Sequence, residues 1–266
     1  RRQVFTEVAK LGFKANAETL VADMEAIPYE IVGEDSEVKY RESIYRARAV
    51  VRERLRLAMG LSLRPENKPV HLTAGVEASN ISEKYYEPPL MQVIPSGCES
   101  CEENKYEVSN VCKGCLAHPC QEVCPRGAIS MVNGKCGKCK SVCPYDAIAK
   151  KERPCKKACG VNAITSDKLG RAYIDADKCV SCGMCMVSCP FGAISDKSQI
   201  FQLSHALRDG DKIIAIVAPA YISQFGDDVT PGKFKTALQV LGFSETYEVA
   251  LGADIGAIAE AHHYVN

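Results

Sequence analysis

All fifteen cysteines of this chain fall in one stretch, from Cys98 to Cys189. The last four follow the pattern C-x2-C-x2-C-x3-C-P, which begins at Cys179 and ends with Cys189 and Pro190. In this spacing the first three thiolates bind one [4Fe–4S] cluster, and the fourth binds a neighbouring cluster. The intervals are short enough for successive sulfurs to surround one face of a cluster. The spacing therefore predicts electron transfer through iron–sulfur clusters.

A second pattern repeats within the same stretch. The dipeptide Ala-Ile follows, four residues later, each of Cys124, Cys143, Cys159 and Cys189. A repeated ending predicts a repeated unit, in which the small apolar pair covers a cluster and starts the next strand. Four endings predict four clusters. At four thiolates each, four clusters would need sixteen, and the chain has fifteen.

Aligning the repeats shows where the sixteenth cysteine would lie. Relative to the stretch before Cys179, about ten residues, among them one cysteine, are absent between Lys135 and Cys136. The sequence also begins with Arg1 rather than Met. We therefore expect these residues to be part of a longer protein, with an omitted segment at this point. The alternative is a degenerate site that holds a three-iron cluster or uses a ligand other than cysteine.

Cluster pairing follows from the rule that the fourth cysteine of a run binds the other cluster. The rule predicts an inserted two-cluster module, residues 112–148, with one site from Cys112, Cys115, Cys120 and Cys143 and another from Cys124, Cys136, Cys139 and the missing cysteine. Outside the insert it predicts two more sites, one from Cys98, Cys101, Cys155 and Cys189 and one from Cys159, Cys179, Cys182 and Cys185. One ferredoxin-like module would then lie in a loop of another.

Two other uses of cysteine compete with this interpretation. Disulfides fit poorly, because a chain of 266 residues can bury a core without them and they persist mainly in oxidising compartments. Zinc fits better for one pair, since Cys98 and Cys101 alone match half of a zinc site. The run from Cys179 to Cys189 does not have zinc spacing.

The remaining composition predicts a soluble globular protein. Hydrophobic residues make up 46% of the chain, and 33 basic residues balance 33 acidic ones, so no overall charge attracts nucleic acid or a membrane surface. No apolar run approaches the roughly eighteen residues that span a bilayer. Free thiolates for iron indicate a reducing compartment, which we take to be the cytoplasm. Exposed clusters indicate an anaerobic cell.

Residues 1–64 have the apolar spacing of helices. A second helix is expected to begin at a cap formed by Asn16 and to stop before Pro28, and a third is expected from Ile44 to Met59. We expect these helices to pack on the cluster region. The third helix carries five arginines, expected to form a solvated face, with partner docking as the alternative: Arg46, Arg48, Arg52, Arg54 and Arg56.

The periodicity changes outside the cysteine stretch. Residues 65–97 are rich in proline and are expected to be loops with one short strand at 91–94. After the cysteines the pattern predicts a buried parallel strand at 212–218, a helix at 230–242, a strand at 246–250 and a helix at 255–264. This order is the opening βαβα of a parallel sheet. It is too short to close a domain, so we expect the chain to continue.

The predicted fold class is therefore α+β, in three parts. Residues 1–90 form a helical N-terminal region, and residues 91–200 form a ferredoxin-like iron–sulfur domain with the insert at 112–148. Residues 201–266 begin an α/β domain.

The segments around and after the cysteines also resemble a known family. Residues 215–226 read AIVAPAYISQFG, and TPGKFK and VALGAD follow at 230–235 and 249–254. With CKGCLAHPC at 112–120 and RPCKKAC at 153–159, they resemble [FeFe]-hydrogenases, and among these the ferredoxin-linked group B. The resemblance implies a catalytic domain that binds the H-cluster, a [4Fe–4S] cube joined to a diiron unit, and interconverts protons and dihydrogen. It also implies ferredoxin as the electron partner.

The resemblance has one departure. The family's H-cluster motifs, which begin with Thr-Ser-Cys-Cys-Pro, are absent from residues 190–266, so no catalytic residue is assigned. We expect the H-cluster to be bound by a continuation of the chain. The favoured hypothesis is a hydrogenase that passes electrons between ferredoxin and the H-cluster. The alternatives are a non-catalytic electron carrier or redox sensor, and an iron–sulfur scaffold protein.

Basic residues gather around Cys155: Lys150, Lys151, Arg153, Lys156 and Lys157. Such a patch would steer an acidic ferredoxin and increase the rate of encounter at low salt. The same charges could instead offset the negative charge of reduced clusters and raise their reduction potentials. Both interpretations stay open at this point.

Overall fold

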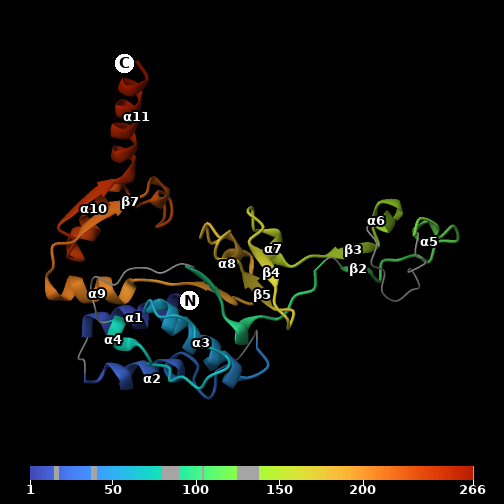
Figure 1. Ribbon diagram of the computed structural model, residues 1–266, viewed down its shortest axis with the longest axis horizontal. Coiled ribbons are helices and arrows are strands. Elements are labelled where there is room, and N and C mark those ends of the chain that lie inside the picture. The colour runs from blue at the N-terminus through green and yellow to red at the C-terminus, as the bar shows by residue number, and fades with distance from the viewer. Residues whose placement is uncertain (15–17, 37–40, 80–89, 104, 125–137, 266) are drawn as a thin grey trace.

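The protein combines helices with small two-stranded sheets (Figure 1). The computed structural model describes residues 1–14, 18–36, 41–79, 90–103, 105–124 and 138–265. The N-terminal helices are α1 (Arg2–Lys14), α2 (Leu20–Ile31), α3 (Ile44–Ala58) and α4 (Val76–Ser79). The helical start predicted from the apolar spacing is confirmed. The short helix α4 lies in a segment that was expected to be loop.

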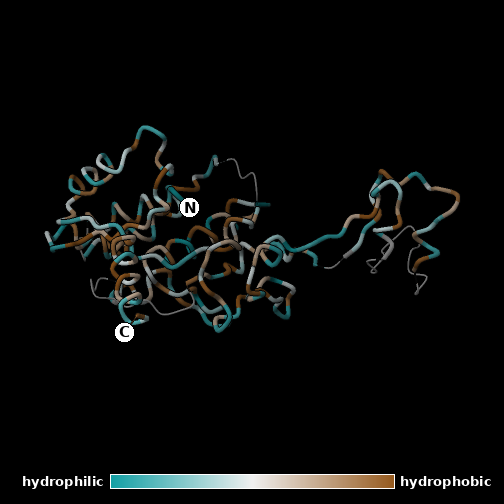
Figure 2. Tube along the Cα trace, turned by 90° about the horizontal axis from the view of Figure 1, so that it is seen from above, coloured by the Kyte–Doolittle hydropathy of each residue, from teal (hydrophilic) through white to brown (hydrophobic). Residues whose placement is uncertain are grey.

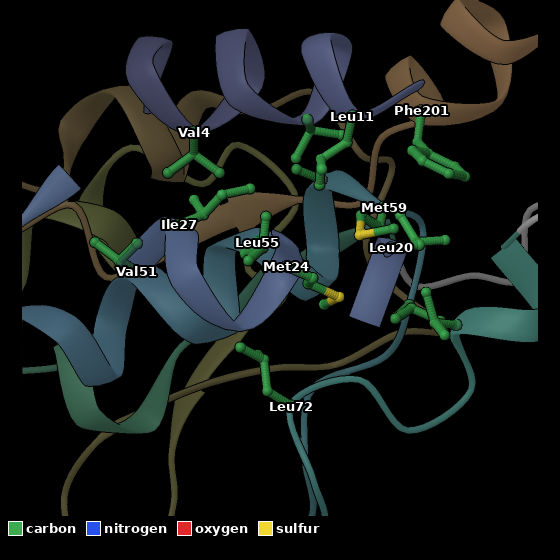
Figure 3. Packing of buried hydrophobic residues seen from close by; sticks show 14 residues of the cluster. Val4, Leu11, Leu20, Met24, Ile27, Val51, Leu55, Met59, Leu72 and Phe201 are labelled. Atoms are coloured by element: carbon green, nitrogen blue, oxygen red, sulfur yellow. The ribbon is translucent and has the colours of Figure 1, made fainter. Parts of the chain in front are cut away.

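These helices share one apolar core with α9 (Ile200–Asp209), a helix that follows the cysteine stretch (Figure 3). Val8, Met24, Leu55 and Phe201 are fully buried in this core. Burial of a side chain of this size stabilises the fold by about 1.5–3 kcal/mol. The core therefore joins the start of the chain to residues near 200, and the iron–sulfur region lies between its two halves in the sequence.

Helix α2 continues through Pro28, so the predicted stop before this proline is wrong. A proline in the last turn removes a single backbone donor, and its ring is buried among the helices. The amide of Val32 donates to the carbonyl of Pro28 at 3.2 Å and closes the turn. The predicted cap, Asn16, lies outside the described residues, and Thr19 occupies the N-cap position.

The arginines of α3 do not form the solvated face that was predicted. Arg48 is 9% exposed and donates to the carbonyl of Val32 at 2.8 Å. Arg56 is 6% exposed and donates to the carbonyls of Ser62, Leu72 and Ala74. The charge pattern did not reveal these roles because loops distant in the sequence supply the acceptors. These guanidinium groups instead fix the loops against the helix.

The central part of the protein consists of short strands and single-turn helices. Strand β1 (Met91–Val93) pairs antiparallel with β6 (Ile194–Asp196), and β4 (Ile164–Ser166) pairs antiparallel with β5 (Ala172–Ile174). Helices α7 (Pro154–Lys157) and α8 (Met184–Ser188) contact each other beside these strands. Helix α3 contacts β6 and the 3-10 turn η1 (Pro95–Gly97), as expected for helices that pack on the cluster region.

A two-stranded ribbon leads from this centre to a separate lobe. Strand β2 (Lys105–Val108) pairs antiparallel with β3 (Ile148–Lys151), and residues 109–147 lie between them in the sequence. The described part of this lobe contains α5 (Pro119–Glu122) and α6 (Lys138–Val142). Figures 1 and 2 show the ribbon and the lobe extending away from the rest of the molecule. The ribbon brings residues 108 and 148 together.

The last part of the chain has the predicted order of elements. Strands β7 (Ile214–Val217) and β8 (Glu245–Glu248) pair in parallel, and they are followed by α10 (Pro231–Val240) and α11 (Val249–Val265) respectively. The Thr230 side chain caps α10 by accepting from the amide of Lys233. The predicted burial of the first strand is wrong for the described residues, because Ile214 and Ile216 are 46% and 71% exposed.

None of the helices in the described part of the chain is both long enough and apolar enough to span a membrane.

Candidate iron–sulfur centres

The turn after a crossing cysteine has the same hydrogen bond in three places. The amides of Ala147, Ala163 and Ala193 donate to the sulfurs of Cys143, Cys159 and Cys189 at 3.4, 3.2 and 3.4 Å. Each donor lies four residues after its acceptor. A hydrogen bond to a charged acceptor favours the charged form, so this turn stabilises a thiolate, the form that binds iron.

The residue before each of these alanines has a left-handed backbone. Asp146, Asn162 and Gly192 have φ values of 49°, 52° and 56°. Glycine, asparagine and aspartate adopt this conformation more easily than other residues. The residue before Ala-Ile therefore differs between the repeats, because any of these three residue types can adopt the backbone conformation that the turn requires. The fourth repeat, after Cys124, falls on residues 125–130, which are outside the described part.

The Ala-Ile pair starts a strand, as predicted, whereas its role in covering a cluster stays a prediction. Ala147, Ala163 and Ala193 are at most 2% exposed, and the isoleucine after each one begins strand β3, β4 or β6. The alanine amide bonds to sulfur while its methyl group is buried, which leaves little space for a larger side chain. The repeat is therefore a structural unit that joins a sulfur, a turn and a strand.

The C-x2-C pairs share a second backbone feature. The residue before the second cysteine has a positive φ in three of the four described pairs: Ser100 at 47°, Gly114 at 58° and Ser181 at 55°. In the fourth pair, Cys182 and Cys185, the positive φ is instead at Gly183. A left-handed residue within such a turn can point successive backbone N–H groups to one side, where they attract an anion. Two of the three positions hold serine, for which this conformation is uncommon, so the turns are held by their surroundings.

The first predicted site of the insert is a cavity lined by four thiols. Cys112, Cys115, Cys120 and Cys143, here called the Cys112 group, line it together with Val108, His118 and Ile148. Four thiols around one enclosed space match the ligand set of one [4Fe–4S] cluster. The crossing cysteine, Cys143, belongs to the cavity although it is distant in sequence.

The second site that the structure gathers is formed by Cys98, Cys101, Cys155 and Cys189, here called the Cys98 group. Burial raises the pKa of the Cys101 thiol, and the neighbouring charges of Cys98 and Cys189 raise it further. Burial raises the pKa of Cys155 to about 11, and the charges of Cys189 and Cys101 add to the rise. These interactions place Cys189 with the Cys98 group, as the crossing rule predicts.

The third site is formed by Cys159, Cys179, Cys182 and Cys185, here called the Cys179 group. Burial raises the pKa of Cys185 to about 11, and the charges of Cys179 and Cys182 contribute. Cys159 and Cys179 pack against the same buried cluster as Cys185. Binding of iron would therefore displace protons from buried thiols in both this group and the Cys98 group.

The fourth predicted site cannot be assembled from the described residues. Cys124 is 7% exposed and packs on Ile148. Cys136, the side chain of Cys139 and the gap proposed between Lys135 and Cys136 lie outside the described part. The structure thus gathers two of the four predicted sets of thiols and three members of another, whereas Cys159 packs on a buried cluster that also includes Cys98 and Cys155. The role of these thiols as ligands stays a prediction.

The two competing uses of cysteine find no counterpart in the described residues. The thirteen cysteines whose side chains the structure describes are all free thiols. No group of three or more His, Cys, Asp or Glu side chains in this part of the chain could hold a single metal ion as placed. A [4Fe–4S] cluster distributes its thiolates around a cube and needs wider spacing than one ion does.

The predicted basic patch beside Cys155 is largely neutralised. Arg153 is 4% exposed, so its assignment to a docking surface is wrong. The four lysines are exposed or partly exposed, and all form ion pairs with glutamates: Lys150 and Lys157 with Glu152, Lys151 with Glu102 and Glu107, and Lys156 with Glu103. Hydrogen bonds from Lys150 and Lys157 lower the pKa of Glu152 to about 2.

Sequence reasoning missed the arginines that contact the cysteine loops. Arg153 donates to the carbonyl of Cys101, Arg54 to that of Gly192 and Arg41 to that of Phe191. One signal was present for Arg54, which directly precedes the core residue Leu55 and so lies beside the buried face of α3. Arg41 and Arg153 have no comparable signal in their sequence neighbourhoods.

Comparison with known families agrees with two parts of this description. Residues 172–195 match the family model of the 4Fe-4S binding domain. Residues 211–266 match that of the iron only hydrogenase large subunit, C-terminal domain. No match was found among the curated proteins or the solved structures. The two matches support an iron–sulfur oxidoreductase that contains a hydrogenase-like segment.

The left-handed turn gives a direct test at Asn162, whose side chain is exposed. Asn162→Val should lower the melting temperature and speed the loss of iron from the reconstituted protein, because a β-branched residue at φ 52° is strained by about 1–3 kcal/mol. Asn162→Gly, the matched control, should retain iron like the unaltered protein. Equal iron loss in both variants would show that the backbone conformation is unimportant. Iron release to a chelator measures the effect.

Proposed function

We propose that this chain is the electron-transfer arm and the beginning of the catalytic domain of a ferredoxin-linked [FeFe]-hydrogenase of group B. The arm would hold up to four [4Fe–4S] clusters and pass electrons between ferredoxin and an H-cluster bound by a continuation of the chain. The whole enzyme would interconvert protons and dihydrogen in the cytoplasm of an anaerobic cell. The H-cluster ligands are not among residues 1–266, so no catalytic residue is assigned.

One observation carries the proposal. A stretch with gathered sets of four thiols leads, within about twenty residues of Cys189, into a segment that matches the iron only hydrogenase large subunit. The Cys98 and Cys179 groups belong to the part of the chain whose short strands pack beside β6. Helix α9 follows β6 and leads to the matched segment. This order supports the proposal that cluster sites lie directly before a catalytic domain.

The proposed division into domains follows the same order. Residues 1–90 are a helical region, residues 91–200 an iron–sulfur domain with an inserted two-cluster module at 112–148, and residues 201–266 the start of an α/β domain. The paired ribbon β2–β3 supports the insert, because it brings together the residues that precede and follow 109–147 in the sequence. The parallel pair β7–β8 supports the last part.

The chain's own residues would hold each cluster and limit its contact with water. Iron–sulfur clusters supply one-electron transfer when bound. The Cys98 and Cys179 groups share a buried cluster of side chains that includes Met91, Ile164, Ile174 and Ile194. These apolar side chains exclude water, while the amides of Ala163, Ala172 and Ala193 donate to cysteine sulfurs. Both solvent exposure and such hydrogen bonds set the potential of a cluster.

Ferredoxin is the proposed electron partner, and the four lysines around Cys155 are the proposed contact. Their ion pairs weaken this part of the proposal, because Glu102, Glu103, Glu107 and Glu152 offset much of their charge. An acidic partner would have to compete with these glutamates. The interaction should accordingly be weak and sensitive to salt.

A non-catalytic electron carrier is the second candidate. It is favoured by the distribution of cysteine, since residues 190–266 contain none and the gathered thiols all belong to the arm. A carrier or redox sensor would need the clusters alone. An iron–sulfur scaffold protein would share the same features.

The test that separates these candidates is hydrogen activity. Residues 1–266 alone should neither evolve nor consume dihydrogen, because they lack cysteine ligands for the H-cluster, whereas the full-length protein should do both once a diiron unit is installed. Gas chromatography with a reduced small-molecule donor measures the rate. A full-length protein with a spectroscopically verified H-cluster and no activity would refute catalysis and leave a carrier or scaffold.

The crossed pairing predicts which cluster a single mutation affects. Cys189→Ser should damage the cluster of the Cys98 group, although Cys189 is the last residue of the run that begins at Cys179, because the charge of Cys189 acts on Cys101 and Cys155. Paramagnetic spectra of the reduced protein report each cluster. Cys182→Ser, the control, should affect the Cys179 group instead. Loss of the same signal in both variants would contradict the pairing.

A further inference from the structure

Two arginines that are distant in sequence flank the Cys98 group, and Arg153 is buried whereas Arg54 is partly buried. Arg153 precedes Cys155 by two residues, and Arg54 comes from helix α3. None of the ion pairs in the described part of the chain includes either residue. Both positive charges are therefore held close to thiols without an ion pair of their own. Glu103 lies near enough to Arg153 for the two charges to interact, but it forms its ion pair with Lys156.

Arg153 carries a buried donor that has no acceptor among the described residues. Its Nε and Nη2 atoms donate to the carbonyl of Cys101 at 3.1 and 2.9 Å, and Nη2 also donates to the carbonyl of Gly170 at 2.7 Å. Nη1 is buried and finds no partner. An unmade hydrogen bond of this kind is costly. Burial raises the pKa of both Cys101 and Cys155, and the Arg153 charge opposes that rise, so the guanidinium lies close to both thiols.

Arg54 approaches the same group from the side of Cys189. Its Nη2 atom donates to the carbonyl of Gly192, three residues after that cysteine. A Cβ at Gly192 would lie 2.5 Å from this nitrogen, so any larger residue would displace the guanidinium group from its present position. Burial and the nearby Arg41 lower the pKa of Arg54, whereas Cys189 raises it. An arginine remains protonated under such conditions.

Two further arginines add to the same charge. Arg41, whose side chain is 7% exposed, donates to the carbonyl of Phe191 at 2.5 Å and pairs with Glu99 at 3.0 Å. Arg46 donates to the carbonyl of Cys98 at 3.5 Å and also pairs with Glu99, at 2.9 Å. The carboxylate of Glu99 offsets part of the positive charge of Arg41 and Arg46. Arg54 and Arg153, which form no ion pair in the described part, leave the surroundings of the Cys98 group with an excess of positive charge.

The Cys179 group has the opposite surroundings. Lys178, next to Cys179, pairs with Asp175 at 2.9 Å, and Asp177 adds a second negative charge. In the described residues no arginine donates to the loops that carry this group. The two neighbouring groups thus have the same ligands but differ in the sign of the charge around them.

We propose that Arg54 and Arg153 raise the reduction potential of a cluster bound by the Cys98 group above that of a cluster bound by the Cys179 group. This inference rests on the proposed function, in which both groups hold clusters. Reduction adds one electron and breaks no bond, so a buried positive charge stabilises the reduced form through Coulomb attraction at low dielectric constant. The first electron to enter this pair of clusters then rests on the Cys98 group.

The test is a potentiometric titration of the anaerobically reconstituted chain, followed by paramagnetic spectra. Signals of the two groups are assigned beforehand with Cys98→Ser and Cys182→Ser. In the unaltered protein the Cys98 group should be reduced first. Arg54→Gln and Arg153→Gln should each shift its one-electron equilibrium at least tenfold toward the oxidised form, which corresponds to about 59 mV. The Cys179 group should not shift.

Two further variants separate charge from structure. Arg56→Gln removes another buried arginine of α3, whose acceptors are the carbonyls of Ser62, Leu72 and Ala74, and it should leave both potentials unchanged. Arg153→Lys keeps the charge and should retain most of the potential. If Arg153→Gln does not fold, Arg54→Gln carries the test alone.

The possible failures are distinct. Full iron content with an unshifted Cys98 group, or equal shifts in both groups, would overturn the assignment of the arginines while leaving the clusters in place. An unaltered protein that binds no iron would overturn both the inference and the proposed function.

Discussion

The hydrogen bond from a backbone amide to a cysteine sulfur is the interaction on which the centre of this protein depends. It requires a tight turn, and the turn requires a residue that tolerates a left-handed backbone at Asp146, Asn162 and Gly192. Once the turn is made, the following alanine is buried and the next strand can begin. A buried thiolate without such donors would be unstable. This one turn therefore determines the position of the cysteine sulfur, the burial of the alanine and the start of the next strand.

The same dependence explains why the strands can be so short. Each described strand has three or four residues, and isolated pairs of this length are marginal in water. The buried cluster beside them contains Cys155 and Cys185 among its core members. Sulfur thus takes the place that larger apolar side chains occupy in an ordinary core. Cluster binding would add its free energy to that of folding, whereas the helical part has a separate apolar core around Leu55 and Phe201.

Sequence signals that act on neighbouring residues correctly predicted where helices and strands begin. The cap at Thr230 and the proline after it fixed the start of α10, and the Ala-Ile endings located three strands. The stop before Pro28 was wrong because a proline in a last turn costs only one hydrogen bond when its ring is buried. The positions of Arg54 and Arg153 could not be predicted, since their acceptors, near Gly192 and Gly170, become neighbours only in the folded chain. An apolar strand such as β7 is expected to be buried, but its sequence does not indicate which residues pack against it.

The central claim is that the gathered thiols are ligands of [4Fe–4S] clusters, and the iron content tests it most directly. Iron and acid-labile sulfide should be measured per chain in anaerobically reconstituted protein that includes the segment proposed between Lys135 and Cys136. Four clusters predict about sixteen atoms of each. About eight atoms of each, or iron without sulfide, would contradict the account.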